Sequence, residues 1–295
     1  MNFKEELQSR TEKIENIIRH YLPKEEGFAK TLASAMNYSM LAGGKRLRPM
    51  MMREVYQMFG GEEKVIEPFM AAMEMIHTHS LIHDDLPALD NDEYRRGRET
   101  TWKVYGEDMG VISGAALLNY AYEVAFSGFD LTRHQDRVIL ALQVLGAKTG
   151  IYGMLGGQSV DVENDGQPLE LPVLDYIYKN KTSALIEASM MIGAILAGAG
   201  NDRIRQVEKA AGYVGLAFQI EDVILDVTST QEELGKPIHS DEKNHKTTYV
   251  TLEGVKKAQQ EVEQLSKEAV AIFDGLEEKN EFLRTLIWEL VNRKK

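Results

Sequence analysis

Two groups of aspartates stand in otherwise apolar, helix-like stretches of the sequence. Asp84, Asp85 and Asp90 lie in SLIHDDLPALDNDEYRRGR, and Asp222 and Asp226 lie in AFQIEDVILD. Carboxylates are costly to hold together in apolar surroundings unless a cation offsets their charge. Hard oxygen ligands favour Mg²⁺, which shares its coordination shell with waters and phosphate oxygens. The two groups together predict Mg²⁺ ions that hold an anion such as a diphosphate.

The second group has the clearer local geometry. Gln219, Asp222 and Asp226 are spaced three and four residues apart, which places them on one face of a helix. A solvated helix face is the alternative reading of such a pair, although the surrounding residues are apolar. In the first group, Asp90 follows six residues after Asp84 and can return to it if the intervening loop is tight.

Basic residues gather at two places in a chain whose net charge is −12. Gly44, Lys45 and Arg48 belong to GGKRLRP, and Arg95 and Arg96 follow the first aspartates. Glycine lets backbone N–H groups approach phosphate oxygens, and the guanidinium fork matches those oxygens in shape. Either run alone is typical of a solvated surface patch. Beside two acidic groups, the two runs predict a phosphate-binding site.

The composition is that of an acidic globular protein. With 295 residues, 27% charged and 43% hydrophobic, the chain is long enough to bury a large core. Its negative charge argues against general nucleic-acid binding. The lack of cysteine excludes disulfides and thiolate chemistry and fits the cytoplasmic location that we expect. The N-terminus does not resemble a signal peptide, and SALIEASMMIGAILAGAG is too short to span a membrane, so no span is expected.

Apolar residues recur with helical periodicity along most of the chain. Helices are predicted at about 3–22, 26–42, 47–59, 64–85, 103–128, 134–163, 172–198, 203–230, 246–273 and 279–292. Strict alternation is rare, so strand content is expected to be near zero. Because no linker divides the chain, residues 1–295 are expected to form one all-α domain, a large helical bundle around a central cavity. Two independent bundles are the alternative.

Six motifs occur in an order that resembles a known family. They are GGKRLRP, EMIHTHSLIHDDLPALDNDEYRRG, GMLGGQSVD, KTSALIEAS, GLAFQIEDVILD and LGKPIHSDEKNHKTTYV. Together they are similar to the bacterial short-chain trans-isoprenyl diphosphate synthases, the group that includes farnesyl diphosphate synthase. The resemblance covers nearly the whole chain, and the four-residue spacer in D-D-x-x-x-x-D resembles the bacterial form.

The resemblance implies the isoprenoid synthase fold and a Mg²⁺-dependent, head-to-tail condensation of isopentenyl diphosphate with an allylic diphosphate. It also implies three Mg²⁺ ions bound with the diphosphate and a homodimer. Farnesyl diphosphate is the expected product, and geranylgeranyl diphosphate is the alternative.

The resemblance also implies a role for individual residues. The metal ligands would be Asp84, Asp85, Asp90, Asp222 and Asp226, with Asp85 and Asp226 in supporting positions. The allylic diphosphate would be held by Arg95, Lys181, Thr182 and Lys236. Isopentenyl diphosphate would be held by Gly44, Lys45, Arg48, His77 and Arg96. The reaction zone would be lined by Gln158, Asp161 and Gln219, and product length would depend on His79 and Ser80.

Three positions depart from the family pattern. Val223 replaces the middle carboxylate of the second D-D-x-x-D motif, and our hypothesis is that Mg²⁺ binding is weakened but not abolished. Ala115 stands where the family commonly has an aspartate. His79 replaces an aromatic residue, often tyrosine, at the floor of the product cavity.

Two other functions compete with the synthase prediction. A terpene cyclase needs a second metal motif whose first ligand would fall at Leu225, which cannot bind a metal. A non-catalytic partner subunit that binds a prenyl diphosphate would tolerate all three departures. The retained Asp84, Asp222 and Lys181 favour catalysis over that alternative. The polar segment 240–246 is expected to be either an exposed loop or a loop that closes over substrate.

Overall fold

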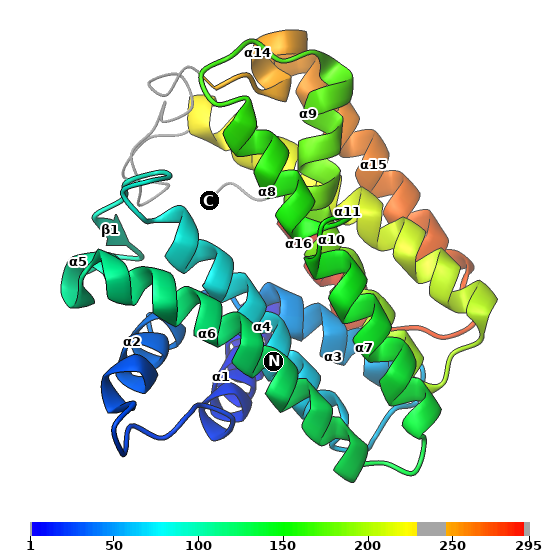
Figure 1. Ribbon diagram of the computed structural model, residues 1–295. Coiled ribbons are helices and arrows are strands. Elements are labelled where there is room, and N and C mark those ends of the chain that lie inside the picture. Colours follow the sequence, from blue (N-terminus) through cyan, green and yellow to red (C-terminus); the bar gives the residue numbers. More distant parts are fainter. Residues whose placement is uncertain (1, 229–245, 292–295) are drawn as a thin grey trace. The chain divides into compact units, whose positions relative to one another are not determined.

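The computed structural model describes residues 2–228 and 246–291. Helices account for nearly all the regular structure in these residues, and the prediction of an all-α fold is confirmed (Figure 1). The exception is a short antiparallel hairpin, in which β1 (Tyr94–Arg95) pairs with β2 (Arg98–Glu99). The chain divides into two compact units, Met1–Arg53 with Glu62–Leu142, and Glu54–Gly61 with Gln143–Lys295.

The first unit is organised around a helix that is apolar on all sides. Its helices are α1 (Phe3–His20), α2 (Lys30–Met40), the start of α3 (Leu47–Met58), α4 (Ile66–Asp84), α5 (Thr101–Tyr105) and α6 (Glu107–Phe126), followed by the short 3₁₀ helix η1 (Ser127–Asp130). Helix α4 packs along α6 and is almost wholly buried. Because a helix without a polar face must be covered on every side, α4 forms the core of this unit and fixes the direction in which its aspartates emerge.

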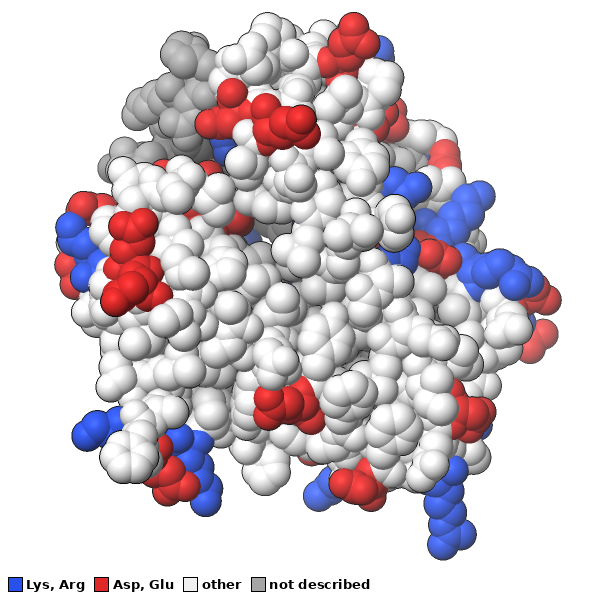
Figure 2. Space-filling model, viewed as in Figure 1, with Lys and Arg blue, Asp and Glu red and all other residues white. Residues whose placement is uncertain are grey.

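Helix α6 has a different surface. Val111, Ile112 and Phe126 are about half exposed on it, and Figure 2 shows few charged side chains over this helix. Val111 and Ile112 are adjacent in the sequence and Phe126 ends the helix, so α6 exposes large apolar side chains at two places along its length.

Besides the end of α3, the second unit contains the helices that follow in the chain. They are α7 (Gln135–Thr149, which begins in the first unit), α8 (Met154–Glu163), α9 (Leu171–Ile177), the π-helical turn η2 (Tyr178–Ser183), α10 (Ala184–Ala197), α11 (Asn201–Thr228), α14 (Tyr249–Glu253), α15 (Val255–Gly275) and α16 (Glu281–Val291). Helix α11 packs against α10, η2 and α15. Gly215 and Gln219 of α11 lie beside the π-helical turn.

Two predicted helices are interrupted in the structure. The run 134–163 is split into α7 and α8 by a turn at 150–153, which contains two glycines. The run 172–198 contains the π-helical turn between α9 and α10. Apolar residues recur with helical spacing on both sides of each break, so periodicity alone does not reveal the breaks.

The apolar run that includes 184–197 forms α10 and is buried, as predicted. A different stretch, 135–163, is long and apolar enough to cross a membrane by length and composition, with a mean hydropathy of 1.5. A third of that window is buried, and one such helix is weak support for a membrane span.

Candidate functional site

The first aspartate region lies where α4 ends. Asp84 is the last residue of the helix and Asp85 caps it. The N–H of Asp90 donates to the carbonyl oxygen of Asp84 at 2.9 Å, so the loop does return to the helix end as predicted. The backbone therefore holds residues 84 and 90 together before any metal binds.

Asp85 has a different environment from its neighbours. Its side chain is buried and accepts a hydrogen bond from Nε of Arg95 at 2.6 Å. Burial raises the pKa of Asp85 to about 6, and the guanidinium of Arg95 opposes that rise. Arg95 also reaches Asp92 at 3.4 Å. Asp85 thus holds Arg95 in place, which fits the supporting position that the sequence predicted for it.

Several predicted cations of the first unit surround His77. Burial lowers the pKa of His77 well below its usual value, and the charges of Arg48, Arg96 and Arg95 lower it further. A guanidinium N–H of Arg96 donates to the carbonyl of Gly43. The structure therefore gathers these residues around a neutral imidazole.

Gly44 is required by this arrangement. A Cβ at position 44 would lie 2.8 Å from Nη1 of Arg96, and the backbone φ of 144° disfavours other residues. Beside these residues is a cavity of about 30 Å³, lined by Asp85, Arg95 and Arg96 among others. Lys45 precedes α3 in the same loop.

The two residues predicted to set product length lie on α4. His79 is 3% exposed, and its Nδ1 lies 2.9 Å from the carbonyl oxygen of Gly114 on α6. Its ring meets that of His83 edge to face at 4.8 Å. Burial lowers the pKa of His79 to about 4. The hydroxyl of Ser80 donates to the backbone carbonyl of His77 on the same helix, and not to the ring of His79 or His83.

Gly114 makes room for this pair of histidines. A Cβ there would lie 2.3 Å from the ring of His83, whose Nε2 lies 3.1 Å from the carbonyl oxygen of Val111. Ala115, next along the chain, is exposed. The aspartate that the family commonly has at this position would therefore face outward and not toward the histidines.

The second region contains an open pocket of about 140 Å³. Nζ of Lys181 lies 2.6 Å from Oδ2 of Asp161, and the hydroxyl of Thr182 donates to Oε1 of Gln219 at 2.7 Å. All four residues line the pocket. It therefore presents a cation, a hydroxyl and an amide to one open space.

The remaining predicted residues of this unit are placed as follows. Gln158 lies on α8 one turn before Asp161 but does not line the pocket. Asp222 is half-buried on α11, while Asp226 is only 3% exposed. Lys236 and residues 240–245 lie outside the described residues.

Glycines allow two helices to close on the turn that carries Lys181 and Thr182. A Cβ at Gly157 would lie 2.2 Å from the backbone nitrogen of Lys181, and one at Gly215 would lie 2.5 Å from Oγ of Ser183. Helices α8 and α11 therefore touch the backbone of η2 directly. A π-helical turn often marks a functional site, because its wider spacing re-aims side chains.

Lys246, Thr247 and Thr248 also line the pocket; sequence reasoning placed Lys246 only in the 240–246 loop and assigned no role to Thr247 and Thr248. They belong to the KTTYV part of the last motif. The signal that could have identified them is a lysine beside two hydroxyls, a combination suited to phosphate oxygens.

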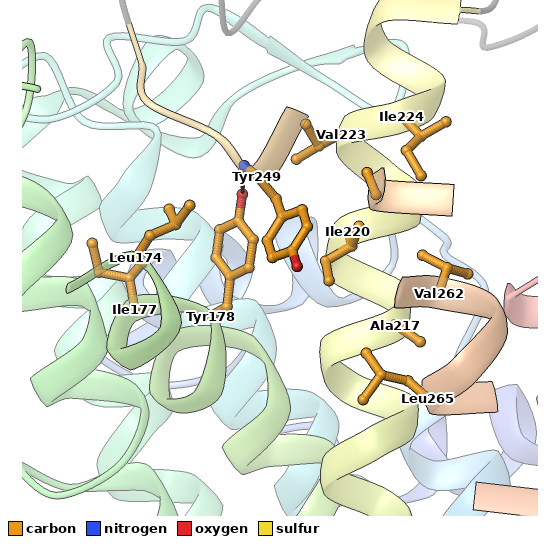
Figure 3. Close-up of a cluster of buried hydrophobic side chains, with 11 residues drawn as sticks. Leu174, Ile177, Tyr178, Ala217, Ile220, Val223, Ile224, Tyr249, Val262 and Leu265 are labelled. Carbon is orange, nitrogen blue, oxygen red and sulfur yellow. Dashed lines mark hydrogen bonds between the residues drawn. The ribbon is translucent and has the colours of Figure 1, made fainter. Parts of the chain in front are cut away.

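Val223 belongs to an apolar cluster that borders the pocket. Figure 3 shows its side chain near Tyr249 and above Ile220, in a cluster that includes Tyr178 and Leu174. Val223 is 4% exposed. The position at which the family has a carboxylate is therefore part of the core in this chain, although it also borders the pocket.

Within residues 2–228 and 246–291, no three Asp, Glu, His or Cys side chains lie close enough to hold a metal unaided. The donor set nevertheless suits Mg²⁺. Asp84 and Asp90 supply hard oxygens held together by the loop, and Asp222 supplies another in the second unit. Mg²⁺ commonly takes only one or two carboxylates and completes its shell with water and substrate phosphates.

The chain is similar in sequence to known prenyl diphosphate synthases. The sequence profile of the polyprenyl synthetases matches residues 29–286. A farnesyl diphosphate synthase from Geobacillus stearothermophilus is 41% identical over 247 residues, 83% of this chain and 82% of the relative. A chloroplastic geranylgeranyl pyrophosphate synthase from Catharanthus roseus is 44% identical over 239 residues, 80% of this chain and 66% of the relative.

A solved structure is also similar. The geranyltransferase from Helicobacter pylori, complexed with magnesium and isoprenyl diphosphate, is 30% identical with a TM-score of 0.84. The match covers 99% of this chain and 97% of that one. Sequence and fold therefore agree on one family, whose members named here differ in product.

Proposed function

Because the chain belongs to the polyprenyl synthetase family, we propose that it condenses isopentenyl diphosphate head to tail with an allylic diphosphate. Prenyltransferase activity is that of the family, and the chain is a prenyltransferase. The observation that carries the finer proposal is the open pocket in which Lys181 and Thr182 stand beside Asp161 and Gln219. A cation and a hydroxyl facing open space are suited to a diphosphate.

In this proposal the allylic diphosphate is bound by Arg95, Lys181, Thr182 and Lys236. Asp84, Asp90 and Asp222 would hold Mg²⁺, which would neutralise the charge that builds on the departing diphosphate. Lys181 is oriented by Asp161, and Thr182 by Gln219, so both are positioned before substrate arrives. Preorganised charge of this kind lowers the barrier to leaving-group departure.

Isopentenyl diphosphate is assigned to Gly44, Lys45, Arg48, His77 and Arg96 in the first unit. His77 is neutral at pH 7, because burial and neighbouring arginines lower its pKa. It therefore offers a hydrogen bond while the surrounding cations supply the charge. The double bond of this substrate attacks the allylic carbon as the carbon–oxygen bond breaks, and the released diphosphate accepts the proton that is lost.

Farnesyl diphosphate is the proposed product, and geranylgeranyl diphosphate is the alternative. The alternative follows from the buried His79, because a histidine is smaller than a tyrosine and would leave more length for the growing chain. Ser80 acts indirectly, through its bond to the backbone of α4.

We also propose that residues 1–295 work as one domain, because the family profile spans both compact units. A homodimer is supported by the exposed apolar residues of α6. A cytoplasmic location is proposed from the lack of cysteine.

The test is a product assay on the purified protein. Labelled isopentenyl diphosphate is supplied with allylic primers of five, ten or fifteen carbons, with Mg²⁺ or with chelator. Elongation that requires Mg²⁺ is expected, with fifteen carbons as the main product. No product from any primer would overturn the proposal and favour a non-catalytic subunit.

A further inference from the structure

Arg46 is a fully buried arginine in the middle of the GGKRLRP motif. Its side chain is 0% exposed, and its backbone adopts a φ of 49°, which non-glycine residues rarely do. Burying a guanidinium and straining the backbone both cost free energy. The fold must therefore satisfy this side chain completely.

The hydrogen bonds of Arg46 join four helices. Its Nε donates to Glu15 on α1 at 2.6 Å, and its Nη1 donates to Glu74 on α4 at 2.8 Å. Its Nη2 donates to the carbonyl of Met40, the last residue of α2, at 2.6 Å. Its own carbonyl accepts from the N–H of Met50 at 3.1 Å, in the first turn of α3. Arg46 therefore hydrogen-bonds both the last residue of α2 and the first turn of α3.

The segment fixed in this way carries the residues assigned to isopentenyl diphosphate. Lys45 precedes Arg46, and Arg48 follows it by two positions. Arg96 donates to the carbonyl of Gly43, at the other end of the same short loop. A loop containing two glycines would otherwise sample many conformations, and the buried arginine removes that freedom.

The two carboxylates also balance charge. Burial lowers the pKa of Arg96, and the charges of Arg46 and Arg95 lower it further, whereas Glu74 and Glu15 oppose that change. Cations gathered before a diphosphate arrives repel one another, and the buried Glu74 and the partly buried Glu15 reduce that repulsion. Both carboxylates accept hydrogen bonds from Arg46.

We propose that Glu15 is a positioning residue for isopentenyl diphosphate, acting through Arg46 on the GGKRLRP loop. The inference rests on the proposed function and adds a residue of the N-terminal helix to it. Glu15 touches no substrate in this account. Its carboxylate orients the guanidinium that fixes Lys45 and Arg48.

The test is Glu15→Gln, which keeps the size of the side chain and removes its charge. KM for isopentenyl diphosphate is expected to rise about tenfold, while KM for the allylic primer and kcat stay within about twofold. Glu15→Asp, which keeps the carboxylate, should recover part of the loss. Glu6→Gln is the matched control, because Glu6 on the same helix pairs only with the neighbouring Arg10 among the described residues.

A merely structural role predicts a different result. In that case Glu15→Gln would lower the melting temperature and leave both KM values unchanged, or raise them equally, and the inference would be wrong. If the wild-type protein does not elongate any primer, the proposed function is wrong, but the role of Glu15 in binding isopentenyl diphosphate can still be tested. Calorimetric titration of isopentenyl diphosphate then decides, with Kd about tenfold weaker for Glu15→Gln expected and equal Kd values contradictory.

Discussion

The two aspartate regions are built in different ways. In the first, α4 stops at Asp84, and a tight loop brings Asp90 back to the helix end. In the second, α11 continues without a break from Asn201 to Thr228, and its carboxylates are separated by one turn of helix. The first region gathers its residues by ending a helix, and the second does so by helical spacing alone.

The regions also differ in where their counter-charges come from. Asp85 is paired with Arg95, ten residues away on the same loop segment. In the second region the lysine assigned to substrate comes from η2 and is paired with Asp161 of α8. In the first region the position of the cation therefore depends on the conformation of one loop. In the second region it depends on how helices from different parts of the chain pack together. This difference can be tested by substitution.

The largest effect is expected from removing one metal-facing carboxylate in each region. Asp84→Asn and Asp222→Asn keep side-chain size and remove a charge that would hold Mg²⁺. We expect kcat/KM to fall by about 10³-fold for Asp84→Asn and about 10²-fold for Asp222→Asn. Steady-state rates over a range of Mg²⁺ concentrations would measure this. A loss below tenfold in either variant would contradict its assignment.

The dependence of the second region on packing is tested by Gly157→Ala. The added Cβ would meet the backbone of Lys181, so α8 must move and displace that lysine. The free energy of unfolding should fall by about 3 kcal/mol, and turnover should fall with it. Denaturant titration measures the first effect.

The matched control is Gly146→Ala on α7, where nothing lies within 4 Å of the added carbon. It should raise the unfolding free energy by about 0.5–1 kcal/mol, because alanine favours helix. Equal effects from both substitutions would refute the packing argument.

Restoring the missing carboxylate in the second region should lower stability. Val223→Asp places a carboxylate in the apolar cluster and should lower the unfolding free energy by about 2 kcal/mol. If the lost carboxylate weakens Mg²⁺ binding, the half-saturating Mg²⁺ concentration should also fall. Val223→Asn controls for polarity without charge. Unchanged stability would show that position 223 is not part of the core.

The smallest effect is expected at His79. The folded state lowers the pKa of His79 to about 4, so the unfolded chain binds its proton more readily. Stability contributed by the neutral ring is therefore lost as pH falls from about 6.5 toward 4. Relative to wild type, His79→Tyr should gain about 1–2 kcal/mol between pH 7 and pH 5.

The raised pKa of Asp85 changes stability in the opposite direction, but it is present in both proteins and cancels. Parallel stability curves for the two proteins would contradict the burial of His79. His79→Tyr should also shorten the longest product, and an unchanged product distribution would exclude this position from control of chain length.

Local spacing was sufficient to predict much of both regions. The spacings of three and four residues between Gln219, Asp222 and Asp226 required only that α11 be a helix. The return of Asp90 to Asp84 followed from a short loop after an apolar helix. In both cases a regular element or a short chain length fixes the geometry.

Features that depend on distant packing could not be predicted. Val223 resembles a lost ligand in the motif, and only the position of Tyr249 shows it to be a core residue. Arg46 resembles another surface cation until Glu15 and Glu74 are placed around it. The π-helical turn was not predicted because its polar residues, YKNKTS, lie between two apolar helical runs and include no glycine or proline that would mark a break. Predicting such a feature requires knowing which residues of another helix pack against it.

The central claim is that both aspartate regions act on one allylic diphosphate. The most direct measurement is a double-mutant cycle with Asp84→Asn, Asp222→Asn and the double variant, scored by kcat/KM. If the regions share one diphosphate, the double variant should lose far less than the product of the two single losses. Losses that multiply fully would contradict the account and indicate two regions that act independently.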